Sequence, residues 1–236
     1  MGALIRTGSL THGRLATKVH SAAATTCRGD RTASVELYWL PLGAGDALPV
    51  VRWNGRIFEA LVARHNRRRP LDLYHSALAV QLDDDRFVIE MAPVWESSAS
   101  DRGVVCEGAV GLRCLRRVRL FRYEVRRWES GVIPDASLAV ESPRSINTDP
   151  ARTQLLLNLV PSFPTASWGR DELGTGEMWN SNSLIAWLLA RSRHDTAAIA
   201  PPVNGRAPGW EAGLVVATRQ PAEAIVARGR RHLVAE

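Results

Sequence analysis

Cysteine is scarce in this chain, and long apolar runs are absent. The three cysteines in 236 residues are odd in number and too few for a disulfide-rich scaffold, so we expect reduced, inert thiols. The longest apolar run of the C-terminal half, residues 184–190, has seven residues, whereas a membrane-spanning helix needs about 20. These features predict a cytoplasmic protein with no membrane span. The cysteines are Cys27, Cys106 and Cys114.

Lysine is almost absent, so the positive charge is carried by arginine. Lys18 is the only lysine among the 30 basic residues, and the net charge is +6 with a pI near 10.0. This excess is modest and part of it lies in the first 30 residues, so we do not expect nucleic acid as a partner. We interpret the arginines between positions 113 and 127 as the solvated face of an antiparallel strand, with an anion-binding face as the alternative.

Several familiar catalytic and binding motifs are also missing. The sequence has no GxxxxGK[ST] phosphate loop, no GxGxxG, no CxxC pair, no HExxH and no GxSxG. The cysteines at positions 106 and 114 are too far apart for a metal knuckle. We therefore expect neither a cofactor nor a metal.

The N-terminal segment differs in composition from the rest of the chain. No acidic residue precedes Asp30, and small and hydroxylated residues are frequent. We interpret residues 1–34 as a disordered or extended tail, with a transit peptide as the alternative. Residues 35–236 are predicted to form one globular domain, since hydrophobic residues make up 45% of the chain.

Hydrophobic patterning predicts an α+β fold, with an antiparallel sheet flanked by two C-terminal helices. Residue types and alternation typical of strands recur in several segments, and helical periodicity follows Asp149-Pro150 and the tetrad Asn180-Ser181-Asn182-Ser183. Asp149 is the expected N-cap of the first helix. Strands are predicted at residues 35–40, 73–82, 86–92, 116–128 (with a bulge between Leu120 and Phe121) and 213–218, and helices at 150–160 and 184–191.

His75 and the tetrad are the candidate catalytic elements. His75 lies within an apolar strand, where a polar ring needs a partner. The tetrad opens a buried helix, whose N-terminal amides and dipole favour an anionic nucleophile and a developing oxyanion. A histidine packed against that helix start could act as general base for Ser181.

This arrangement resembles the circularly permuted papain-like fold, the group of lecithin–retinol acyltransferase relatives and PPPDE-type thiol hydrolases. The resemblance rests on Tyr74-His75-Ser76-Ala77-Leu78, followed 106 residues after His75 by the tetrad. In that group a strand histidine precedes a nucleophilic cysteine at a helix N-terminus. The resemblance implies amide or ester cleavage or acyl transfer, on a peptide, amide or acyl substrate.

The sequence departs from this pattern at the nucleophile, where Ser181 stands in place of cysteine. A serine hydroxyl is much less acidic than a thiol and needs a well-aligned base. Ser181 is therefore a genuine serine nucleophile, the remnant of a lost one, or a Cys-to-Ser change. The rival hypothesis is a catalytically inactive binding or interaction protein of the same fold.

Glu90 is the candidate to orient His75, and Asn180, Asn182 and Trp179 are candidate substrate-binding residues. A two-residue turn that pairs Asp83 with Arg86 puts Glu90 on the face of His75, and a three-residue turn puts it on the other face. We favour the first. Each residue also has a structural interpretation: a buried histidine bonded to a carbonyl, a helix cap, a solvated strand residue or a core tryptophan.

Overall fold

The computed structural model describes residues 31–43, 59, 63–64, 67–94 and 103–221. The chain divides into two units, residues 1–30 and 31–236, and all described residues belong to the second. The predicted tail therefore lies almost entirely outside the described residues. Its last positions do not belong to a tail, because Ala33 and Ser34 already form the start of the first strand.

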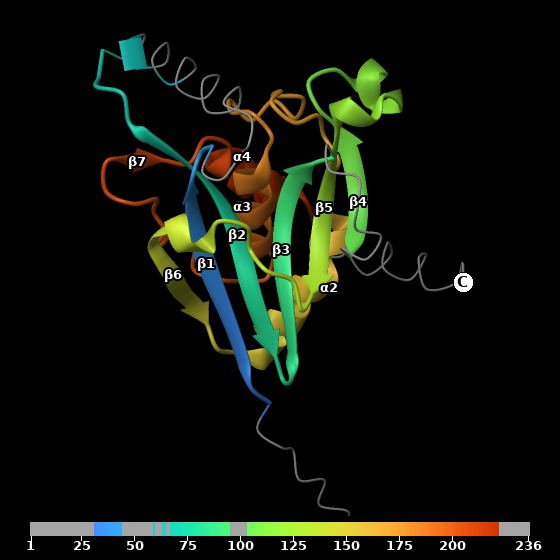
Figure 1. The fold of residues 1–236 in the computed structure, drawn as a ribbon, viewed down its shortest axis with the longest axis vertical. Coiled ribbons are helices and arrows are strands. Elements are labelled where there is room, and N and C mark those ends of the chain that lie inside the picture. Colours follow the sequence, from blue (N-terminus) through green and yellow to red (C-terminus); the bar gives the residue numbers. More distant parts are fainter. Residues whose placement is uncertain (1–30, 44–58, 60–62, 65–66, 95–102, 222–236) are drawn as a thin grey trace, which may run out of the picture. The chain divides into compact units, whose positions relative to one another are not determined.

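Seven strands of the described residues form the sheet, and six of them make one antiparallel array (Figure 1). Their order is β4-β5-β3-β2-β1-β6, and the two-residue β7 pairs in parallel with the start of β2. The strands are β1 (Ala33–Pro41), β2 (Asp72–Leu82), β3 (Asp85–Pro93), β4 (Val104–Ala109), β5 (Arg122–Glu129), β6 (Val140–Asn147) and β7 (Gly205–Arg206).

Three helices of the described part lie on one face of this sheet, which we call the helix face (Figure 1). They are α2 (Pro150–Leu159), α3 (Ser181–Arg191) and α4 (Trp210–Arg219). The main core lies here, where alternate strand residues such as Leu37 and Leu78 pack with nearly the whole of α3. The predicted α+β class, an antiparallel sheet flanked by C-terminal helices, is confirmed. Within the described ranges, no helix has the length and apolarity to cross a membrane.

The opposite face of the sheet, the outer face, carries a smaller core. Leu40, Ala77 and Val88 pack there against Ile133, which lies in the segment that leaves β5 and crosses in front of the sheet (Figure 1). That segment ends in a short 3₁₀ turn, η3 (Ala136–Leu138). Because successive side chains of a strand point to opposite faces, β1, β2, β3 and β5 contribute to both cores.

The strand predicted at residues 213–218 is wrong, because these residues belong to α4. Val215 and Val216 favour a strand by intrinsic propensity, but the buried positions of this segment follow a helical stripe that faces α3. Gly213 permits the close approach: a β-carbon at this position would clash with the backbone carbonyl of Ser183. Tertiary packing therefore overrides local strand propensity.

The strand predicted at residues 116–128 is wrong in its first half. β5 begins at Arg122, and the preceding residues form two 3₁₀ turns, η1 (Arg113–Arg117) and η2 (Arg119–Phe121). Both turns are closed by local backbone hydrogen bonds, from Val118 to Leu115 and from Phe121 to Val118. The expected bulge between Leu120 and Phe121 therefore falls before the strand begins. The other predicted strands and helices are present within a few residues of their expected bounds.

Replacing Gly213 with alanine is expected to destabilise the protein, although alanine usually stabilises a helix interior by up to about 1 kcal/mol relative to glycine. The added methyl group meets the Ser183 carbonyl and forces α3 and α4 apart, which costs about 2 kcal/mol. Denaturant unfolding measures the change. Thr218→Ala, at an exposed position of the same helix, is the control and stays within about 0.5 kcal/mol. A Gly213→Ala variant as stable as wild type contradicts this packing.

Candidate site at the start of helix α3

The structure places His75 and Ser181 on opposite faces of the sheet. His75 pairs with Leu40 of β1 and shares its face with Ala77, and both of those residues belong to the outer core. The next residue along, Ser76, points the other way and donates a hydrogen bond to Asn182 on α3. The predicted contact between the imidazole and the Ser181 hydroxyl is therefore not formed.

The side chain of His75 is largely removed from solvent on the outer face. Removal from water lowers its pKa to about 4, and the nearby carboxylate of Asp135 opposes this shift. The ring is therefore neutral at pH 7. A neutral imidazole is the form that a general base requires, but no tetrad residue lies on its face.

Glu90 does share the outer face with His75, as the favoured hairpin turn predicts. The turn contains two residues, Asp83 and Asp84, but the register is displaced by two positions, because Leu82 rather than Asp83 closes it. A displacement of two preserves which face each side chain occupies. The expected face of Glu90 is therefore confirmed, although the pairing behind it is wrong.

The carboxylate of Glu90 is engaged by arginine rather than by histidine. Arg126 of β5 lies directly opposite Glu90 and is almost fully buried between two carboxylates. Its guanidinium is 2.8 Å from Glu90 and 3.0 Å from Glu124. Paired and hydrogen-bonded charges are the form in which buried ions are tolerated, so Glu90 has a structural partner.

The tetrad forms the N-terminal cap of α3. Asn180 is the N-cap, and its side-chain oxygen accepts hydrogen bonds from the backbone amides of Asn182 and Ser183. The hydroxyl of Ser183 in turn accepts from the Asn180 amide at 3.1 Å, completing a capping box. Ser183 also donates to the carbonyl of Gly209, just before α4. The capping interpretation therefore accounts for both Asn180 and Ser183.

Asn182 joins three parts of the fold. Its side-chain oxygen accepts from Ser76, 2.8 Å away, and its amide group donates to the carbonyls of Tyr74 and Pro208, each at 2.9 Å. The side chains of Asn182 and Ser76 are both buried, so these hydrogen bonds satisfy groups that have little access to water. Asn182 thus fixes the start of α3 to β2 and to the loop before α4.

Ser181 is the exception within the tetrad. It is the first residue of α3 and is only 4% exposed. Within the described residues its hydroxyl makes no hydrogen bond, whereas the other three side chains are all engaged. Ser181 is therefore the one tetrad side chain that the cap and the sheet contact do not use.

Trp179 is a core residue. It is 1% exposed, its ring stacks on Phe163, and its indole nitrogen donates to the carbonyl of Pro164. These contacts account for its whole side chain and leave it no surface for a substrate. The core interpretation therefore describes Trp179 better than the predicted binding role.

The sequence analysis missed the polar partners that hold the tetrad in place. Glu177 accepts a hydrogen bond from the Gly209 amide and pairs with Arg206, which also lies 3.7 Å from the buried Glu59. Together with Ser76, these residues fix the loop before α4 beside the cap. Successive side chains of a strand point to opposite faces, so the sequence predicts that Ser76 and His75 point apart. Only the position of α3 in the fold shows that Ser76 is the one that faces this helix.

Two negative findings complete the description of the site. In the part of the chain that the structure describes, no three His, Cys, Asp or Glu side chains gather in a way that could hold a metal ion. Comparison of the chain with protein-family models, curated proteins and solved structures finds no match.

We predict that Asn182→Ala lowers the free energy of unfolding by about 3 kcal/mol, because it leaves the Ser76 hydroxyl and two carbonyls unpaired in the interior. Ser181→Ala, at the neighbouring buried position, changes it by less than about 1 kcal/mol, since it removes no hydrogen bond of the described residues. Denaturant titrations of both variants test this. If both variants lose the same free energy of unfolding, the structural role given to Asn182 is wrong.

Stability is expected to fall as the pH is lowered from 7 to 4.5. The pKa of His75 is about 4 in the folded protein and about 6.5 when unfolded, so the unfolded chain binds the additional proton across this interval. The linkage amounts to about 2 kcal/mol. The His75→Gln variant loses that much less stability over the same interval in denaturant titrations. Parallel pH profiles for wild type and variant contradict the prediction.

Proposed function

We propose that this chain is a non-catalytic binding or interaction domain. The observation that carries the proposal is the separation of His75 and Ser181 by the sheet, which follows from the Ser76–Asn182 hydrogen bond at 2.8 Å. A serine hydroxyl reacts at useful rates only with an aligned base, and its expected base faces the other way.

The engagement of the remaining polar groups supports the same proposal. Asn180 and Ser183 cap α3, Asn182 clamps the helix to β2, and Glu90 pairs with Arg126. Polar groups that are hydrogen-bonded to buried partners have a fixed geometry, and their hydrogen-bonding capacity is used within the protein rather than on a substrate. Of the predicted catalytic and binding residues near α3, only Ser181 is left without a structural task in the described part of the chain.

Ser181 supports a second candidate function, that of an amide or ester hydrolase or acyltransferase related to the permuted papain-like group. The supporting observation is its position as the first residue of the apolar α3, buried and without a hydrogen bond from the described residues. The helix amides would stabilise an oxyanion beside it. This function requires a base other than His75 for the Ser181 proton.

A fluorophosphonate probe on the full chain separates the two candidates. We expect no labelling of wild type above the level of Ser181→Ala, and the same result for His75→Ala, because the hydroxyl has no aligned base. The readout is mass spectrometry of the labelled peptide, with a known serine hydrolase as positive control. Stoichiometric labelling that disappears in Ser181→Ala overturns the non-catalytic proposal and supports the second candidate.

A further inference from the structure

A short segment between β4 and β5 projects from the end of the sheet (Figure 1). We call residues 112–121 the arginine projection; it consists of η1 and η2 with the residue before each turn. Neither turn contains a buried residue. The segment therefore contributes little to either core, and its composition needs another explanation.

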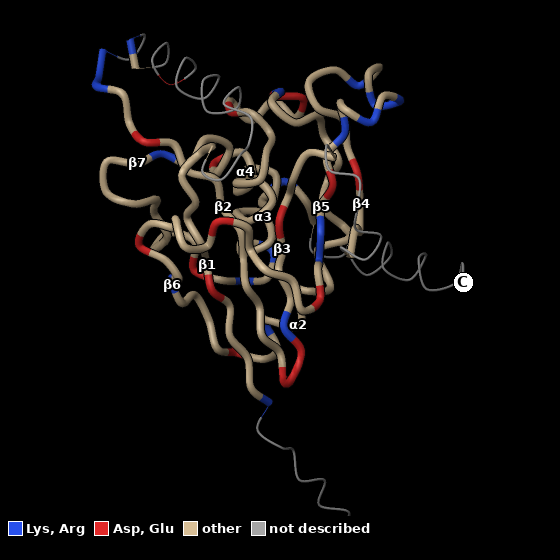
Figure 2. The backbone as a smooth tube through the Cα atoms, in the orientation of Figure 1, with Lys and Arg blue, Asp and Glu red and all other residues tan. Residues whose placement is uncertain are grey.

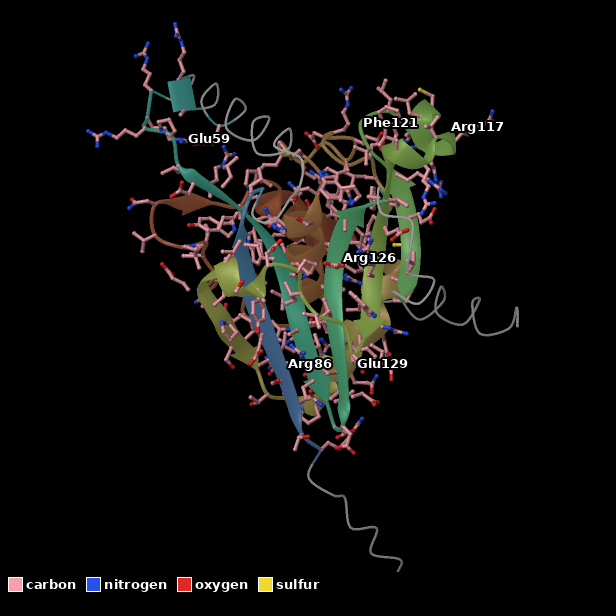
Figure 3. All side chains as sticks on the ribbon, viewed as in Figure 1. Glu59, Arg86, Arg117, Phe121, Arg126 and Glu129 are labelled. Carbon is pink, nitrogen blue, oxygen red and sulfur yellow. The ribbon has the colours of Figure 1, made fainter. Side chains whose placement is uncertain are left out.

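The charge of the arginine projection is entirely positive. It contains four arginines and no acidic residue, and Figure 2 shows them gathered in this part of the fold. Arg113 contacts Glu172 but keeps most of its side chain exposed. Within the described residues no ion pair engages the others, and Figure 3 shows Arg117 on the outside of the projection. The remaining arginines are Arg116, Arg117 and Arg119.

Aliphatic side chains stand among these arginines and face solvent. Leu112 is 50% exposed, Val118 49% and Leu120 55%. Single exposed aliphatic residues are common on protein surfaces, but three on one short protrusion form a cluster that gains free energy on leaving water. These aliphatic residues and the arginines that make no ion pair with a described residue lie on the same projection.

We propose that the arginine projection docks the protein on an anionic membrane surface. Its aliphatic side chains would enter the boundary between headgroups and acyl chains, and its arginines would bind lipid phosphates and carboxylates. The long arginine stems suit this position, because they cover apolar surface while their charged ends stay at the headgroups. This inference does not depend on whether Ser181 reacts.

Nucleic acid fits the same charge less well. Proteins that bind single strands place aromatic rings for bases to stack on, whereas Leu112, Val118 and Leu120 are aliphatic. Phe121, the one aromatic residue of the projection, is only partly exposed. Proteins that bind a duplex gain affinity from phosphate contacts and polar readout of the grooves, to which Leu112, Val118 and Leu120 would add little. A bilayer is the anionic partner that uses both the charge and the aliphatic cluster.

Vesicle co-sedimentation of the full chain tests the proposal. We expect binding to vesicles of phosphatidylcholine with about 30% phosphatidylserine, weaker binding at high salt, and little binding to phosphatidylcholine alone. Replacing Arg116, Arg117 and Arg119 together with glutamine is expected to weaken binding about a hundredfold, taking about 1 kcal/mol per arginine near the surface. Replacing Val118 and Leu120 with serine is expected to weaken it about tenfold.

Matched controls separate the projection from the rest of the surface. Glutamine at the exposed Arg86, Arg152 and Arg193 makes the same change in net charge elsewhere, and serine at the exposed Val132 and Val203 likewise replaces two exposed aliphatic side chains elsewhere. Both control sets are expected to bind like wild type. Failure to bind anionic vesicles overturns the proposal, as does equal weakening by the controls.

A duplex oligonucleotide provides the competing ligand. If it binds as tightly as the anionic vesicles, and serine at Val118 and Leu120 weakens neither interaction, the projection is a nucleic-acid contact and the membrane proposal is wrong. If the serine variant selectively loses vesicle binding, the aliphatic cluster is confirmed as part of a membrane contact. Labelling of Ser181 in the probe experiment has no bearing on any of these outcomes.

Discussion

The side-chain amide of Asn182 is the contact on which the geometry of this fold depends. It is buried, and it accepts one hydrogen bond and donates two, to groups on β2 and before α4. A buried amide left without partners is costly, so this set of bonds specifies one docking position for α3. The capping box at Asn180 is local to α3, whereas the close approach of α4 at Gly213 requires this docking position.

The docking position decides what chemistry the chain can support. In a strand, moving by one residue changes the face, and Asn182 selects Ser76 as the residue of β2 that meets the helix. His75 therefore faces Leu40 and the outer core. A motif that matches a catalytic pattern in residue types and order does not form a dyad when the sheet lies between its members.

The two faces of the sheet bury polar side chains of different kinds. On the helix face the tetrad side chains are neutral and are held by hydrogen bonds to one another, to β2 and to the loop before α4. On the outer face Arg126 lies between Glu90 and Glu124. The arginines of the projection lie beyond both cores, which is why they remain available for a partner outside the protein. The strand interpretation holds for the arginines from Arg122 onward, which lie in β5, and fails for those before it, because none of the described strands pairs with residues 113–120.

The sequence by itself determined the α+β class, the β2–β3 hairpin, the cap at Asp149 and the buried helix at the tetrad, because these depend on local patterns of alternation, capping and periodicity. It also determined that Glu90 and His75 share a face, since strand parity is a local property once the turn length is known. Only the tertiary structure decided that residues 213–218 are helical, that β5 begins at Arg122, and that Ser76 rather than His75 meets α3. Each of these outcomes depends on which distant surface packs against the segment, and side-chain contacts between distant segments cannot be read from local pattern.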